Sequence, residues 1–253
     1  MSIVSLADNL LLPNWPAPEN VRAVSSKRCG GYSTGSFQGL NLGDHVGDVP
    51  SLVAQNRQHF KTQACMPTEP LWLQQVHGIV VARPDLAKVA AATAVVADAA
   101  YSCAREKVCV VMTADCLPLL VCDKAGREVA AIHAGWRGLA AGVIEQTIMH
   151  FKAKPADIMV WLGPAIGPQS FEVGAEVRAA FVSRHPATAA AFKVQANGKY
   201  LADIYLLARL RLAVQGITAI YGGNYCTYQQ AEHFFSYRRD GQTGRMASAI
   251  WLD

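Results

Sequence analysis

The sequence predicts a mixed α/β fold with layered sheets. Apolar, β-branched runs typical of strands outnumber the segments with helical spacing, and several of these runs follow one another without an intervening helix. A doubly wound fold alternates strands and helices, so this order favours layered sheets instead. With 253 residues and a hydrophobic content of 51%, the chain can form one large globular domain or two small ones.

The spacing of apolar residues gives the expected elements in chain order. Strands are predicted at residues 21–26, 71–76, 107–114, 117–122, 128–133, 157–162, 218–222 and 246–252. Helices are predicted at residues 51–64, 139–151, 174–184 and 202–215. The second helix follows Gly138 directly, and the third ends before the His185-Pro186 pair, because proline cannot continue a helix.

Charge and hydropathy restrict the classes of partner. The net charge is +4, charged residues make up 17% of the chain, and no five like charges occur together, which disfavours nucleic-acid and membrane-surface partners. Residues 1–15 lack the basic segment and long apolar core of a signal peptide. The Ala-rich run at 89–97 is far shorter than the ~20 residues of a membrane span. We therefore expect a cytoplasmic protein, as a monomer or small homo-oligomer.

The cysteines predict a reduced protein. The chain has seven cysteines and no Cys-x-x-Cys pair. Cys103, Cys109, Cys116 and Cys122 occur in one apolar region, where free cysteine usually behaves as a small buried hydrophobe. We therefore expect most of the cysteines to be reduced core residues, and only Cys116 lies within a motif.

Three potential ligands or nucleophiles each follow or end a predicted strand. They belong to the segments LWLQQVHG (71–78), VVMTADCLPLL (110–120) and VAAIHAGWRG (129–138). A lone histidine at a strand end is more often structural, but His77, Cys116 and His133 share one setting. Their wide separation along the chain suits a site built across a sheet. Two imidazoles and a thiolate form a three-ligand zinc set with an open fourth position, or a Cys–His nucleophile pair.

The HAGWRG segment joins a predicted strand to a predicted helix. Gly135 and Gly138 permit a tight turn that exposes N–H groups at a helix N-terminus, where anions bind. Arg137 adds a forked donor for phosphate or carboxylate. The alternative is an ordinary strand-to-helix turn whose arginine forms a surface salt bridge.

Asp115 and His45 are further candidates, of which His45 is the weaker. Asp115 is positioned to orient a histidine or to help hold the site, or simply to cap the turn before Leu117-Pro118. His45 lies in a loop rich in glycine and aspartate at 41–48.

The two ends of the chain contain further candidates. The glycine-rich stretch 25–48 is too long for a simple connection, and Arg28 beside Gly30-Gly31 can hold an anionic or ribose-like group. Its alternative is a surface loop. Near the C-terminus, aromatic residues stand beside arginines and suit a planar polar ligand such as a nucleobase. For Phe234 and Phe235, however, a place in the core is the better interpretation.

Taken together, these segments resemble a known family. They are RCGGYS, LNLGDHVGD, QNR, WLQQVHG, MTADCLP, HAGWRG, WLGPAIGP, FEVG, LADI, CTY and FFSYRRDGQTGRMA. In this order, over roughly residues 20–252, they resemble the bacterial laccase-domain family, whose members are called polyphenol oxidases or purine nucleoside phosphorylases. The resemblance implies a single domain over residues 1–253 with α/β/β/α layers, similar to cysteine hydrolases. One departure is Lys27-Arg28, where the family usually has Thr-Arg.

The resemblance also implies site residues. The metal ligands and catalytic residues would be His77, Cys116 and His133, with zinc as the expected metal and a single copper ion as an alternative. Candidate substrate-binding residues are Arg28, Asn41, Asp115 and Arg137.

The resemblance implies phosphorolysis of purine nucleosides by phosphate, with adenosine, inosine and methylthioadenosine as substrates, and zinc-dependent deamination of adenosine. A copper-dependent polyphenol oxidase is an alternative. Seven histidines without a His-x-His pair, however, make a full multicopper site hard to build. Another alternative is a hydrolase that edits peptidoglycan precursors, with Cys116 as nucleophile and His133 as base. A non-enzymatic zinc-binding protein is the residual class.

Overall fold

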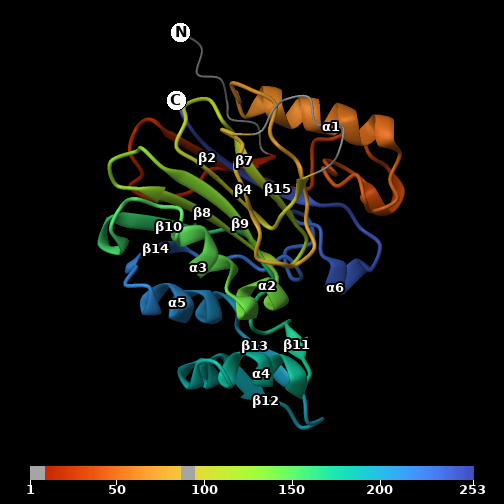
Figure 1. Cartoon of the computed structure of the whole chain (residues 1–253). Helices are drawn as coiled ribbons and strands as arrows, with labels where there is room; N and C mark the ends of the chain where they lie inside the picture. The colour runs from red at the N-terminus through yellow and green to blue at the C-terminus, as the bar shows by residue number, and fades with distance from the viewer. Residues whose placement is uncertain (1–8, 87–94) are drawn as a thin grey trace.

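Two β-sheets lie face to face at the centre of the computed structural model, which describes residues 9–86 and 95–253 (Figure 1). One sheet has four strands, in the order β1 (Leu10–Leu11), β2 (Val21–Ser26), β15 (Met246–Leu252) and β7 (Cys109–Thr113). The other has six, in the order β14 (Ala219–Gly222), β10 (Ile158–Leu162), β8 (Leu117–Asp123), β9 (Val129–Ala134), β6 (Ala99–Ser102) and β4 (Val81–Ala82). The start of the chain and most of the Ala-rich run lie outside the described residues.

The six-stranded sheet is mixed. Strands β10 and β14 are parallel, as are β4 and β6, while β8 is antiparallel to both β9 and β10. In the β8–β9 pair, Pro118 lies opposite His133. This register places the start of β8 and the end of β9 at the same end of the strand pair. Cys116 immediately precedes β8 there.

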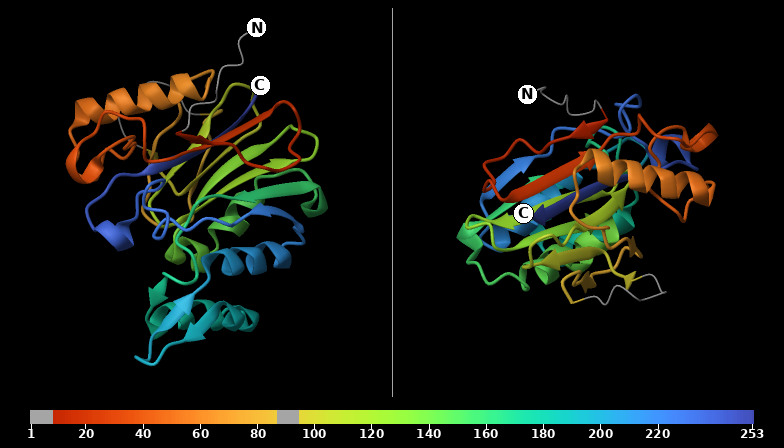
Figure 2. Two further views of the ribbon diagram at one scale, coloured as in Figure 1. Left: turned by 180° about the vertical axis from the view of Figure 1, so that it is seen from behind. Right: turned by 90° about the horizontal axis from the view of Figure 1, so that it is seen from above.

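Helices cover the outer face of each sheet, which completes four layers (Figure 2). Helix α1 (Pro50–Gln63) lies over the four-stranded sheet, where Phe60 and Trp251 share a core. Helices α2 (Trp136–Ala141), α3 (Val143–Ile148) and α5 (Ile204–Val214) cover the six-stranded sheet. A third core lies between the sheets and includes Leu120 and Ile250. The predicted mixed α/β fold with α/β/β/α layers is therefore confirmed.

A smaller unit projects beyond the α2 end of these layers (Figure 1). It consists of β11 (Glu172–Val173), α4 (Ala175–Val182), η3 (Pro186–Ala191), β12 (Phe192–Val194) and β13 (Tyr200–Ala202), with sheet order β11-β13-β12. Arg184 connects it to the main body by donating to the carbonyl oxygen of Ala140 at 3.0 Å. The remaining short elements are η1 (Gly35–Phe37), β3 (Leu73–Gln74), β5 (Val95–Val96), η2 (Pro155–Asp157) and α6 (Tyr237–Asp240).

Two predicted elements are corrected. The helix expected at 139–151 is divided into α2 and α3 by Gly142, whose φ of 109° cannot continue a right-handed helix. The strand expected at 71–76 is reduced to Leu73–Gln74. There the side-chain oxygen of Gln75 accepts from the Met112 N–H at 2.7 Å, and its side-chain nitrogen donates to the Met112 carbonyl oxygen at 2.8 Å. The side chain of Gln75, rather than its backbone, therefore pairs with Met112. The sequence pattern did not predict β6, because AAYS is short and lacks β-branched residues.

The cysteines are free, as expected, but most are not core residues. Only Cys109 and Cys122 are buried, whereas Cys103 is exposed beyond the end of β6. Within the described ranges, no helix combines the length and apolar character that crossing a bilayer would require.

Burial of the six-stranded sheet on both faces makes a stability prediction. Leu119 and Leu120 are both 0% exposed but face different cores, one shared with the helices and one shared with the other sheet. We expect Leu119→Ala and Leu120→Ala each to reduce the free energy of unfolding by about 2–5 kcal/mol, measured by urea denaturation. The exposed Val214 provides the control, since Val214→Ala should change it by less than about 0.5 kcal/mol. A near-neutral effect at Leu119 or Leu120 would contradict the two-sided burial.

Candidate active site

The structure brings His77, Cys116 and His133 together at one edge of the six-stranded sheet. Their ligand atoms all lie within 4.8 Å of one another. The Cys116 Sγ is 3.7 Å from the His77 Nε2, and the two imidazole centroids are 4.9 Å apart. His77 lies in the loop after β3, Cys116 in the turn before β8, and His133 near the end of strand β9. Residues far apart in sequence therefore converge on one point, as the strand-end motifs predicted.

A single buried carboxylate positions both histidines. Asp98 is 0% exposed and immediately precedes β6. Its Oδ1 accepts hydrogen bonds from the His133 Nδ1 and the His77 backbone N–H, both at 2.8 Å. Its Oδ2 accepts from the Gly78 N–H at 2.6 Å. These bonds hold His77 at a φ of 60°, a left-handed conformation uncommon for residues other than glycine.

Asp98 therefore takes the orienting role that the sequence suggested for Asp115. The Asp115 carboxylate instead accepts from the Thr227 Oγ1 at 2.6 Å and the Arg238 backbone N–H at 2.7 Å. Asp115 connects the Cys116 turn to α6 and has no hydrogen bond to either histidine. The only sequence signal for Asp98 was an isolated acid inside an apolar run.

The cluster favours an ion pair between Cys116 and His133. Burial alone would raise the pKa of Cys116, but the nearby His133 and His77 outweigh it and lower the pKa to about 6. Burial would lower the pKa of His133, yet the Cys116 thiolate and the Asp98 carboxylate raise it to about 9. In the metal-free protein, thiolate and imidazolium therefore coexist between about pH 6 and about pH 9.

The absence of a side chain at Gly135 leaves room for the cluster. A Cβ at this position would lie 2.5 Å from the His77 Cδ2 and 3.0 Å from the Cys116 Sγ. Gly138 is restricted in the same way, because its Cβ would lie 2.8 Å from the carbonyl oxygen of Gly78. The glycines of HAGWRG therefore provide close approach at the cluster. Gly135, at a φ of −66°, is not there for an unusual backbone conformation.

The chemistry of the donor set fits a metal ion. A thiolate and two imidazoles are common zinc ligands, and a metal-bound histidine usually donates its other ring nitrogen to a carboxylate, as His133 does to Asp98. The 3.7 Å between Sγ and Nε2 is close to the span of two ligands with bonds of about 2.0–2.3 Å. Three protein donors would leave one position open toward the cavity described next.

All three residues line a cavity of about 550 Å³, within the usual range for small-molecule sites. Its walls combine apolar and aromatic side chains, including Trp136, Phe171 and Tyr237, with arginines. Arg137, one of the predicted substrate-binding residues, is in the wall and stacks on Trp136, 4.4 Å from the ring centroid. Among the described residues that line the cavity, Asp115 is the one carboxylate.

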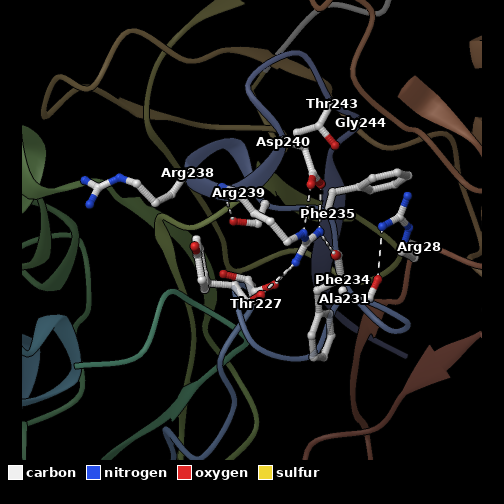
Figure 3. Close-up of polar contacts among 12 residues, drawn as sticks. Arg28, Thr227, Ala231, Phe234, Phe235, Arg238, Arg239, Asp240, Thr243 and Gly244 are labelled. Carbon is white, nitrogen blue, oxygen red and sulfur yellow. Dashed lines mark hydrogen bonds and ion pairs between the residues drawn. The ribbon is translucent and has the colours of Figure 1, made fainter. Parts of the chain in front are cut away.

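Two predicted substrate-binding residues lie outside this cavity. Arg28 lines a separate surface hollow, donates to the carbonyl oxygen of Ala231 at 3.0 Å and stacks on Phe235 (Figure 3). Asn41 is fully buried, and its Oδ1 accepts from the backbone N–H of Arg245. Phe234 and Phe235 are core residues, as the sequence favoured.

Other cavity residues were missed or ranked low. Arg245 was one of several C-terminal arginines, and His45 was a weak candidate, yet both line the cavity. Phe171 and Ile204 lie in the segments FEVG and LADI, but no local chemistry marked them as cavity residues, and they enter the wall where the chain leaves for the projecting unit and returns from it.

A family model described as a multi-copper polyphenol oxidoreductase laccase matches residues 22–253 of this chain. The chain belongs to this family. It is 54% identical over 243 residues to the purine nucleoside phosphorylase YfiH of Escherichia coli strain K12, covering 96% of this chain and 98% of that protein. It is also 48% identical over 243 residues to a purine nucleoside phosphorylase of Haemophilus influenzae, covering 95% of this chain and 98% of the relative.

Solved structures show the same fold. A crystal structure of a Neisseria meningitidis protein has a TM-score of 0.92 and 49% identity, covering 97% of this chain and 99% of its own. The crystal structure of YlmD from Geobacillus stearothermophilus has a TM-score of 0.85 and 30% identity, covering 97% of both chains.

The close approach at Gly135 predicts the effect of one added methyl group. Gly135→Ala should displace His77 and Cys116 and weaken zinc binding about 10–100-fold, measured by competition with a chelator. The protein should still fold, because alanine accepts this backbone conformation. Gly35→Ala is the control: its Cβ would meet nothing within 4 Å, although its φ of 60° is strained. It should cost some stability and leave zinc affinity unchanged. Equal zinc affinity in the wild type and Gly135→Ala would refute this account of Gly135.

The electrostatics of the cluster predict how metal-free protein reacts with iodoacetamide. The thiolate is the form present above the pKa, so labelling of Cys116 should rise with pH through a midpoint near 6. Peptide mass spectrometry of protein labelled at several pH values would measure this midpoint. The buried Cys122, whose pKa burial raises to about 12, should stay unlabelled. A Cys116 midpoint above pH 8 would show that the histidines do not stabilise the thiolate.

Proposed function

We propose that this protein is a purine nucleoside phosphorylase that uses adenosine, inosine and methylthioadenosine in the cytoplasm. The observation that carries the proposal is the three-donor cluster opening onto a cavity with aromatic and arginine walls. Relatives named purine nucleoside phosphorylase, at 54% and 48% identity, support it.

Phosphorolysis makes two demands that this cavity is suited to meet. An oxygen of dihydrogen phosphate forms a bond to the anomeric carbon of the ribose while the glycosidic C–N bond breaks, and the departing base takes up a proton from the phosphate. The incoming phosphate needs cationic donors, which the arginines of the wall provide. The departing base needs a flat apolar surface, which Trp136, Phe171 and Tyr237 provide.

We propose zinc as the metal, held by His77, Cys116 and His133. Zinc would supply a Lewis acid and an activated water at the open position. We propose that the same position would also support deamination of adenosine, in which water adds at C6 and ammonia leaves. Asp98 keeps the free nitrogen of His133 directed at the cluster in either reaction.

A cysteine hydrolase is the second candidate, and one observation favours it. Cys116, His133 and Asp98 have the order of nucleophile, base and orienting carboxylate. We favour the ligand role for Cys116, because phosphorolysis brings its own nucleophile. An oxidase with one copper ion at the cluster is a weaker alternative, because seven histidines without a His-x-His pair do not suit a multicopper site.

Metal analysis followed by nucleoside assays tests the proposal. Purified protein is expected to contain zinc and to release free base from adenosine, inosine and methylthioadenosine only when phosphate is present. Cys116→Ser should lose metal and activity together, because a neutral hydroxyl is a poorer zinc ligand than a thiolate. Cys29→Ser, at an exposed cysteine, is the matched control and should retain both.

Three results would contradict this assignment. Base release without phosphate would exclude a phosphorylase. A covalent substrate adduct on Cys116, with metal retained in Cys116→Ser, would favour the hydrolase. Oxygen consumption with phenols, together with bound copper, would favour the oxidase.

A further inference from the structure

We propose that Arg245 and Thr243 bind the phosphate co-substrate in a side arm of the cavity. This inference rests on the proposed function for the identity of the anion. The side arm is a hollow of about 350 Å³ that also includes Gln242. It shares His45, Tyr237 and Arg245 with the wall of the main cavity, so the arm adjoins the space in front of the metal cluster.

Arg245 is a half-buried cation: against the effect of burial, the nearby Cys116 and Asp115 raise its pKa, but neither forms a hydrogen bond or a salt bridge with it. It forms no salt bridge with any carboxylate in the described part of the chain, and no acidic residue there lines the side arm. One guanidinium nitrogen, Nη1, donates to the carbonyl oxygens of Thr243 and Gly244, at 3.0 and 3.1 Å. Nε and Nη2 have no protein acceptor within the described ranges, so these two nitrogens, with three N–H groups, remain for a ligand. Burial lowers the pKa of Arg245, as expected for a guanidinium that has lost water.

The acids nearby in sequence and space are already paired. Asp240 receives two hydrogen bonds from Arg239, at 2.8 and 2.7 Å (Figure 3). Both carboxylate oxygens of Asp115 are occupied by Thr227 and the Arg238 backbone. Arg239 also donates to the carbonyl oxygens of Thr227 and Phe234, which fixes the segment around α6. Neither carboxylate forms a salt bridge with Arg245, which leaves its unbonded guanidinium nitrogens available to an external anion.

The neighbouring loop holds Arg245 in place before any ligand arrives. The Arg245 backbone donates to the Asn41 Oδ1 at 2.9 Å and accepts from the Leu42 N–H at 3.1 Å. Its side chain lies against Gly43, where a Cβ would come within 2.7 Å of the Arg245 Cγ. Asn41, predicted to bind substrate, therefore acts on the site by positioning Arg245. A guanidinium fixed in this way loses little freedom when it binds an oxyanion.

Thr243 provides an independent indication of a ligand. It is 1% exposed, and its Oγ1 is buried without a hydrogen-bond partner. An unpaired buried hydroxyl is costly unless a bound group pairs with it. Thr243 lines the same side arm as Arg245. A hydroxyl donor beside a forked guanidinium matches the oxygens of phosphate.

Titration of the metal-loaded, full-length protein with inorganic phosphate tests the site. Arg245→Met is expected to weaken phosphate binding at least about tenfold by calorimetry and to raise the KM for phosphate by a similar factor. The KM for nucleoside should change less than about twofold. Arg22→Met, which removes an exposed arginine of β2, is the charge-matched control and should leave both constants unchanged.

Thr243→Val distinguishes ligand binding from a structural role. Valine has the shape of threonine without the hydroxyl, so the melting temperature without phosphate should stay equal or rise. The increase in melting temperature that phosphate produces should become smaller. A purely structural threonine would give the opposite result, with lower stability and an unchanged response to phosphate.

The outcomes separate this inference from the proposed function. If the protein phosphorolyses nucleosides and both variants keep the wild-type constants for phosphate, the inference fails and the proposed function stands. Loss of phosphate binding in Arg137→Met alone would then place the phosphate site at Arg137. If phosphate binding depends on Arg245 and no nucleoside is phosphorolysed, the proposed function fails and the oxyanion site stands.

Discussion

The buried carboxylate of Asp98 is the interaction on which the site depends. It accepts from the ring of His133 and from the peptide N–H groups of Val76, His77 and Gly78. One side chain therefore sets the tautomer of one imidazole and the backbone conformation that presents the other. These four donors also satisfy a charge that would be expensive to bury alone. The sheet delivers Asp98 to this point because β6 pairs with β9, which carries His133.

The sequence could predict the cluster because chemistry and location coincide there. His77, Cys116 and His133 each follow or end an apolar run, and strand ends in one sheet meet at an edge. Asp98 could not be predicted, because its role arises from tertiary hydrogen bonds that leave no periodic pattern. The same limit explains Gln75, whose side-chain amide pairs with β7 where a backbone strand was expected.

The arginines show a second limit of sequence reasoning. Arg28 and Arg245 both occur among glycines and polar residues, and nothing local distinguishes them. Their positions are set by contacts across the whole chain, since Arg245 is held by Asn41 and Arg28 by Ala231. The layered fold, in contrast, could be predicted from strand order, because hydrophobic runs without intervening helices leave few other ways to bury both faces.

The position of β15 has a consequence for how the chain is made. This last strand of the sequence lies in the middle of the four-stranded sheet, between β2 and β7, where Ser248 meets Ser25 side chain to side chain at 2.9 Å. A nascent chain that has not yet reached β15 has two apolar strands, β2 and β7, with open edges and no strand to join them. The sheet therefore cannot close until residues 246–252 have left the ribosome. Premature termination even a few residues upstream of Met246 would yield an aggregation-prone product rather than a shortened enzyme.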